Sequence, residues 1–218
     1  MYFSPGERSL GDIVKKVEHG ERLSKDDGIR LLESHDLLAI GYMANLVREK
    51  KHGDYTYFIC GVDKVDKSAN IDTSSEAFML YGHGESIEDR IDHLISIREQ
   101  QDKSGEFLTF FPRASYPKHT DLEEEEIVKT RTTGVEDLKI LAVSRLMLDN
   151  FPHIKANWVM IGPKLFQVSL SFGVDDIDGA GAETDQPLAV ADIINMIKKA
   201  NRKPLERDKH YNVVREGF

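Results

Sequence analysis

Polar side chains that could bind a ligand follow several apolar segments of the sequence. Tyr81 and His83 stand at the end of one such segment, in Tyr-Gly-His-Gly-Glu, and Asp178 ends another. Asn157 lies within a third, Ile154 to Met160. In folds built from alternating strands and helices, ligands bind at the carboxyl ends of the parallel strands. We therefore predict a ligand site centred on His83, with Tyr81, Asn157 and Asp178 as neighbours.

Structural roles compete with this interpretation. His83 can be a turn residue that bonds to the backbone, and burial can consume all four side chains in internal hydrogen bonds. Asp175, Asp176 and Asp178 lack the spacing of a calcium loop, so we expect helix capping by Asp178 and ordinary solvation. No nucleophile and base are paired in the sequence. We predict no metal site and assign no catalytic residue.

The chain contains one cysteine, Cys60. A single cysteine excludes an intrachain disulfide, a Cys-x-x-Cys redox pair and a zinc or iron–sulfur site made of cysteines from one chain. Cys60 follows an apolar segment, where a buried and inert thiol is the usual outcome.

Composition limits the possible partners. The 218 residues carry 29 Lys and Arg against 38 Asp and Glu, a net charge of −9. Binding to nucleic acid depends mainly on neutralising phosphates, so we expect no nucleic-acid partner. No apolar run approaches the roughly 18 residues of a membrane span. The first residues do not read as a signal peptide, which predicts a cytoplasmic protein with no membrane contact.

Periodicity predicts helices first and then alternating strands and helices. Ser24 with Asp27 forms a capping box, and Asp36 can cap a second helix. Five segments read as strands: Tyr55 to Cys60, Ala77 to Tyr81, Phe107 to Phe111, Ile154 to Met160 and Val174 to Ile177. Later helices are expected after Ser86, from Thr133 to about Leu148, from Pro163 to Gly173 and from Leu188 to Ala200.

This order predicts an α/β fold with a largely parallel sheet. A complete barrel of eight strands typically needs about 250 residues, so we expect a partial or open (β/α) barrel. The expected parts are a helical segment at 1–54, the partial barrel at 55–205 and a tail at 206–218. In the fourth strand, Lys155 and Asn157 face away from Trp158, which we expect in the core. Their polar face is either a barrel interior or a solvent-facing sheet.

An ordered set of segments resembles aminofutalosine synthase, a family of radical S-adenosylmethionine enzymes in the futalosine route to menaquinone. The segments are Asp36–Tyr42, His52–Phe58, Met79–His83, Glu85, Arg90–His93, Leu141–Trp158, Gly162–Leu165, Phe172–Gly173, Asp176–Gly179, Glu206–Asp208 and Tyr211–Val214. Together they cover about two thirds of the chain.

The resemblance implies a radical S-adenosylmethionine barrel of the TIM type. Its [4Fe-4S] cluster is held by a Cys-x3-Cys-x2-Cys loop after the first strand. The implied reaction adds an adenosyl radical to a carboxyvinyloxybenzoate, and aminodeoxyfutalosine is the product. Here the match stops after Phe58 and resumes near Met79, and the three-cysteine loop is missing between them. One thiolate cannot replace three.

We therefore expect a member of this family that does not bind the cluster and is not catalytically competent alone. Whether it binds S-adenosylmethionine stays open. The alternative is a non-catalytic ligand-binding or assembly module built on a partial barrel. Expected partners are a nucleoside or benzoate-like small molecule, and further copies of the chain joined through open sheet edges.

Overall fold

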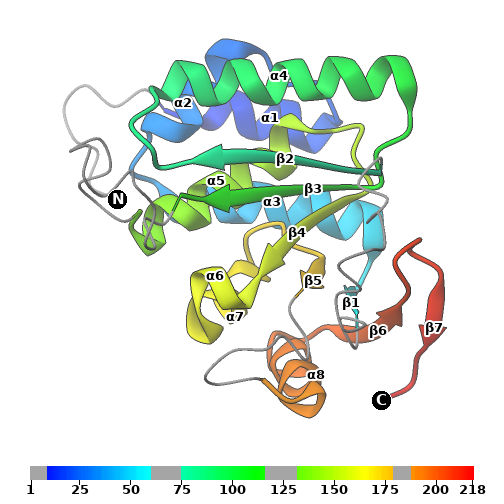
Figure 1. The fold of residues 1–218 in the computed structure, drawn as a ribbon. Helices are drawn as coiled ribbons and strands as arrows, with labels where there is room; N and C mark the ends of the chain where they lie inside the picture. Colours follow the sequence, from blue (N-terminus) through cyan, green and yellow to red (C-terminus); the bar gives the residue numbers. More distant parts are fainter. Residues whose placement is uncertain (1–8, 60–74, 116–131, 179–187) are drawn as a thin grey trace, which may run out of the picture.

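The computed structural model describes residues 9–59, 75–115, 132–178 and 188–218 (Figure 1). Three helices come first: α1 (Gly11–His19), α2 (Lys25–Glu33) and α3 (Leu37–His52). The expected caps are confirmed, because Ser24 and Asp27 form a reciprocal capping box and Asp36 accepts a hydrogen bond from the backbone of Ala39.

Strands and helices then alternate. The order is β1 (Tyr55–Phe58), β2 (Glu76–Tyr81), α4 (Ile87–Ser104), β3 (Thr109–Ala114), α5 (Gly134–Met147), β4 (His153–Asn157), α6 (Trp158–Ile161), α7 (Pro163–Ser169), β5 (Asp176–Asp178), α8 (Val190–Lys199), β6 (Lys203–Arg207) and β7 (Val213–Arg215). Five strands were expected from the sequence, and the described residues contain seven.

The strands form one open sheet in the order β2-β3-β4-β5-β1-β6-β7. Every neighbouring pair is parallel except β6 and β7. The first strand of the chain therefore lies inside the sheet, between β5 and β6 (Figure 1). This arrangement confirms the expected α/β fold with an open, partial (β/α) barrel.

The helices cover one face of the sheet and build the core there. Met79, Phe110, Ile154 and Ile177 point to this face and are at most 1% exposed. Since α4 packs on β2 and α5 packs on β3 and β4, these side chains are buried beneath helices. Trp158 is also buried, as expected.

Two expected boundaries differ from the structure. The strand predicted to reach Met160 ends at Asn157, because the side chain of Asn157 accepts a hydrogen bond from Val159 N at 2.8 Å and begins α6. The segment expected as a tail from residue 206 begins inside β6, which pairs in parallel with β1. Cys60 lies outside the described residues. Within those residues, every helix is too short or too polar to cross a membrane.

Candidate functional site

The sheet face away from the helices is rich in charged side chains. Strand register places Lys155 beside Asp176 and Asn157 beside Asp178. On β2 and β3 the same face carries Glu76, Phe78, Leu80, Thr109, Phe111 and Arg113. In a (β/α) barrel the face of the sheet away from the helices is the inner, concave one. Lys155 on this face is only 8% exposed in its side chain, so the face is not fully solvated.

Lys155 joins two carboxylates on different strands. Its ammonium forms an ion pair with Glu76 on β2 and lies 3.4 Å from Oδ2 of Asp178 on β5. These two contacts hold both carboxylates close to the same ammonium. Lys155 therefore ties the carboxyl end of β5 to the outer strand β2.

Arg113 forms an exposed cationic site beside this pair. Its Nη2 lies 3.3 Å from Oε1 of Glu76, and its side chain is 43% exposed. The guanidinium carbon lies 4.8 Å from the ring centroid of Phe78 and 4.9 Å from that of Phe111. A guanidinium on aromatic rings, with one side open to solvent, can bind a planar anion or stack on an aromatic group.

A second polar cluster lies near the amino ends of the strands and centres on Asp175. Asp175 is fully buried and forms an ion pair with Arg145, which is also fully buried. Its Oδ2 lies 2.5 Å from Nδ1 of His153, and its Oδ1 accepts from Ile154 N at 2.9 Å. Burial alone would raise the pKa of Asp175, but Arg145 and His153 lower it to about 2. The carboxylate is therefore ionised and held by internal bonds.

Asp176 is bound in the same way by the C-terminal segment. Arg207 donates two hydrogen bonds to its carboxylate, at 2.7 and 2.6 Å, and Tyr211 donates a third at 2.6 Å. The Tyr211 ring stacks on His153 with centroids 4.2 Å apart. The prediction that Asp175 and Asp176 are solvated is wrong, because two arginines neutralise them inside the protein.

His52, His153 and Asp175 bring three possible metal-ligand atoms within 4.8 Å of one another. The two imidazoles are stacked, with an angle of 19° between their planes. Nitrogen lone pairs lie in the ring plane, so two stacked rings cannot both direct them at one ion unless a ring rotates. His52 also lies 2.8 Å from Pro152 O, and Asp175 is bound by Arg145. This geometry is that of a structural hydrogen-bond cluster.

Two of the four residues in the predicted site are direct neighbours. Asn157 and Asp178 are partners in the pairing of β4 with β5, at the carboxyl ends of both strands. Topology therefore brings together two residues that are 21 positions apart in sequence, as expected. Their role in binding a ligand stays a prediction.

The other two lie elsewhere. Tyr81 points into the helix-covered core, where it is 2% exposed and its hydroxyl donates to the buried Asp137 at 2.8 Å. His83 is in the loop after β2, with its side chain 44% exposed and its Nδ1 3.4 Å from Glu85. Three strand spacings of about 4.8 Å separate β2 from β5, so only an extended ligand could reach both His83 and Asp178.

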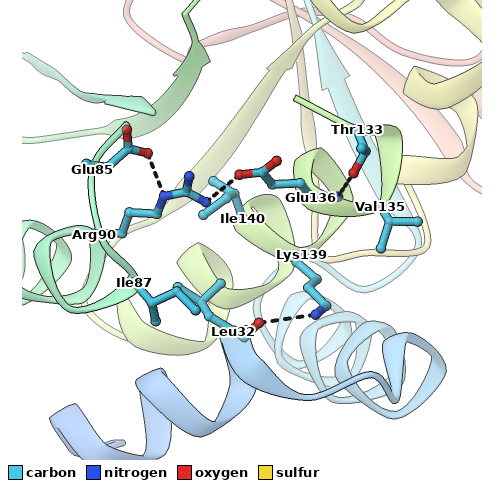
Figure 2. A pocket seen from close by; sticks show the side chains of 9 residues that line it. All are labelled: Leu32, Glu85, Ile87, Arg90, Thr133, Val135, Glu136, Lys139 and Ile140. Atoms are coloured by element: carbon cyan, nitrogen blue, oxygen red, sulfur yellow. Dashed lines mark hydrogen bonds and ion pairs between the residues drawn. The ribbon is translucent and has the colours of Figure 1, made fainter. Parts of the chain in front are cut away.

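A cavity of about 300 Å³ opens between the amino ends of α4 and α5 (Figure 2). Arg90 crosses it and bonds Glu85 at 2.5 Å and Glu136 at 2.7 Å. Lys139 donates to the backbone of Leu32 at 3.1 Å. The charged groups that line the cavity are thus bonded to protein atoms, and none of the four predicted residues lines it.

Comparison with known proteins assigns the family. Residues 104–216, more than half of the chain, match the family described as the CofH/MqnC C-terminal region. The chain belongs to this family. The matched segment contains α5 and the strands from β3 to β7, and therefore both polar clusters except Glu76 and His52.

Curated relatives of this CofH/MqnC family chain include two aminodeoxyfutalosine synthases. The chain is 45% identical to the enzyme of Thermus thermophilus, in an alignment that covers 65% of this chain and 41% of that protein. It is 37% identical to the enzyme of Streptomyces coelicolor, in an alignment that covers 63% of this chain and 40% of that protein. The expected resemblance is confirmed, and the chain spans about two fifths of the length of these relatives.

A longer match joins the CofH/MqnC family chain to a related transferase. It is 32% identical to the 5-amino-6-(D-ribitylamino)uracil–L-tyrosine 4-hydroxyphenyl transferase of Methanococcoides burtonii, in an alignment that covers 98% of this chain and 63% of that protein. Among solved structures, methylornithine synthase (PylB) superposes with a TM-score of 0.67 at 15% identity, covering 90% of this chain and 97% of that one. The hydrogenase maturase HydG from Carboxydothermus hydrogenoformans superposes with a TM-score of 0.66 at 11% sequence identity, covering 93% of this chain and 80% of that one. These two likenesses show the fold.

The donor set of the CofH/MqnC family chain does not fit a [4Fe-4S] cluster. A cluster with one iron open to S-adenosylmethionine needs three protein thiolates, and the sequence contains one cysteine.

Several residues of the two clusters could not be predicted from the sequence. Neither Glu76 nor Arg113 stands in a sequence motif, and they meet only through the pairing of β2 with β3. Arg207 and Tyr211 were placed in a tail. The alternation of polar and apolar residues around Lys155 was the one available signal for the charged face.

Proposed function

We propose that this chain is an aminodeoxyfutalosine synthase-like protein that binds a small molecule on the concave face of its sheet. We further propose that it does not perform the radical transfer alone. The first part is supported by the 45% identity with an aminodeoxyfutalosine synthase together with the polar carboxyl ends of β4 and β5. The second is supported by the cysteine count.

The proposed ligand is a nucleoside or a benzoate-like acid. Asn157 and Asp178 offer an amide and a carboxylate, which suit the hydroxyl and ring nitrogen groups of a nucleoside. Arg113, backed by Phe78 and Phe111, suits a carboxylate attached to a ring. A mixed polar and aromatic lining is typical of small-molecule sites.

A second candidate function is a non-catalytic ligand-binding or assembly module. The single cysteine and the open sheet favour it, because both remove features that the implied chemistry needs. Under either proposal the protein is placed in the cytoplasm.

The cluster proposal is tested by anaerobic reconstitution with iron and sulfide. We expect iron and sulfide contents far below one cluster per monomer, because three thiolates are required. A stoichiometric cluster on the monomeric chain would overturn the proposal.

The ligand proposal is tested by calorimetric titration with S-adenosylmethionine, an aminofutalosine-like nucleoside and a carboxylated benzoate. Asp178→Asn and Arg113→Gln should weaken binding, and Leu38→Ala, at an 81% exposed position on α3, is the matched control. If His83→Ala changes the affinity by less than about 0.5 kcal/mol, His83 is not part of the site. If Asp178→Asn and Arg113→Gln also leave it unchanged, the concave face is not the site.

A further inference from the structure

The strand β2 forms an edge of the sheet. Within the described part of the chain it pairs on one side only, with β3. The carbonyls of Ser75 and Tyr81 accept hydrogen bonds from the β3 side, at 2.7 Å each. Because backbone groups alternate in direction along a strand, the N–H and C=O groups of Phe78 and Leu80 point outward from the edge.

The same edge carries two exposed apolar side chains. Phe78 is 54% exposed and Leu80 is 47% exposed, and both lie on the concave face. Exposed edges of this kind are templates for pairing with another chain, and proteins usually protect them with lysine, proline or a covering segment. Glu76 is the one charged side chain of this strand.

We propose that two copies of this chain associate by antiparallel pairing of β2 with β2, around a two-fold axis at Met79. This register sets Phe78 of each copy opposite Leu80 of the other. Each of these two pairs can exchange two backbone hydrogen bonds, since the groups concerned point outward. Both exposed apolar side chains then gain an apolar cross-strand neighbour, which stabilises sheet pairing.

The strand is complementary to a second copy of itself in this orientation. Its one charged side chain, Glu76, is already bound by Lys155 and Arg113 of its own chain, so pairing of two copies brings no unpaired carboxylates together. The contact is isologous, so it closes as a dimer and does not extend into a fibre.

The experiment measures the mass of the purified full chain by sedimentation and light scattering from low to high micromolar concentration. We expect a monomer–dimer equilibrium. Leu80→Lys places a charge opposite Phe78 in both pairs and should raise the dissociation constant at least about tenfold. Val214→Lys is the control, because Val214 is 62% exposed on β7 at the other edge of the sheet.

Amide hydrogen exchange of the unmodified chain provides a second measurement that needs no variant. The amides of Phe78 and Leu80 should become more protected as the concentration rises, and those of β7 should not. A chain that stays monomeric over the whole range, including one that pairs only with a different protein, would overturn the proposal. So would a dimer that tolerates Leu80→Lys or one that is lost in Val214→Lys.

Discussion

Replacing Arg145 by methionine should strongly destabilise the fold. Arg145 and Asp175 are both fully buried, and methionine fills similar apolar volume without the charge. Removing one partner of a buried ion pair typically costs about 3–5 kcal/mol, because the other charge is left without compensation. Asp175 keeps its bonds to His153 and to Ile154 N. We therefore expect the free energy of unfolding to fall by about 3 kcal/mol, at the lower end of this range.

The loss should depend on pH through His52. Burial lowers the pKa of His52, Asp175 opposes this effect, and Arg145 adds to it. A group with a lowered pKa in the folded state stabilises the fold above its unfolded pKa, and this contribution is lost as the pH falls. Without Arg145 the pKa of His52 rises. Acidification should therefore lower the free energy of unfolding of the variant by less than that of the unmodified protein. The difference between the two proteins should therefore be larger at about pH 8 than at about pH 5.5, on either side of the ordinary histidine pKa.

Urea unfolding at both pH values measures the difference, with circular dichroism as the probe. Arg22→Met is the matched control, because Arg22 bonds two carboxylates but is 44% exposed. Exposed pairs contribute at most about 1 kcal/mol. A loss below about 1 kcal/mol for Arg145→Met at pH 8, or an equal loss at both pH values, would refute this reasoning.

Three further variants test other parts of the structure. Tyr211→Phe removes a donor to the buried carboxylate of Asp176 and should lower the free energy of unfolding by about 1.5–3 kcal/mol. Gly41→Ala should cost about 1–3 kcal/mol although alanine favours helices, because its Cβ would lie 2.7 Å from the ring of Phe172. Burial raises the pKa of Asp137, so Asp137→Asn should raise the free energy of unfolding at pH 7, and this gain should vanish as the pH falls through that pKa.

Two substitutions serve as controls for these variants in the same unfolding assay. Tyr55→Phe removes a hydroxyl from a side chain that is 38% exposed and should change stability by less than about 0.5 kcal/mol. Gly11→Ala adds a Cβ whose nearest neighbour is 3.4 Å away, an ordinary contact. If the variants and their controls behave alike, the packing and bonding described for Tyr211 and Gly41 do not determine stability.

Local signals predicted the beginnings of helices well and the last strands poorly. Ser24 and Asp36 cap their helices as expected, because a cap depends on residues within one turn. The strand β6 has the sequence Lys-Pro-Leu-Glu-Arg, which contains no apolar run. It becomes a strand through pairing with β1, a contact that no local pattern can reveal.

The candidate site shows the same division. Parallel topology sufficed to place Asn157 beside Asp178. It did not place Tyr81, because neighbouring residues of a strand face opposite ways and a shift of one position moves a side chain from the concave face into the core. The burial of Asp175 and Asp176 was also missed, since their arginine partners lie 30 or more positions away.

The position of β6 beside β1 has a consequence for how the chain folds. Register pairs Tyr55 with Lys203, so an interior pairing of the sheet joins segments about 150 residues apart. Contacts this distant must overcome a large loop-closure entropy, and folding rates fall as the mean sequence separation of contacts increases. During synthesis, β1 emerges early but cannot gain this neighbour until residue 207 has left the ribosome. The N-terminal helices can pack in the meantime, whereas closure of the sheet is a late event.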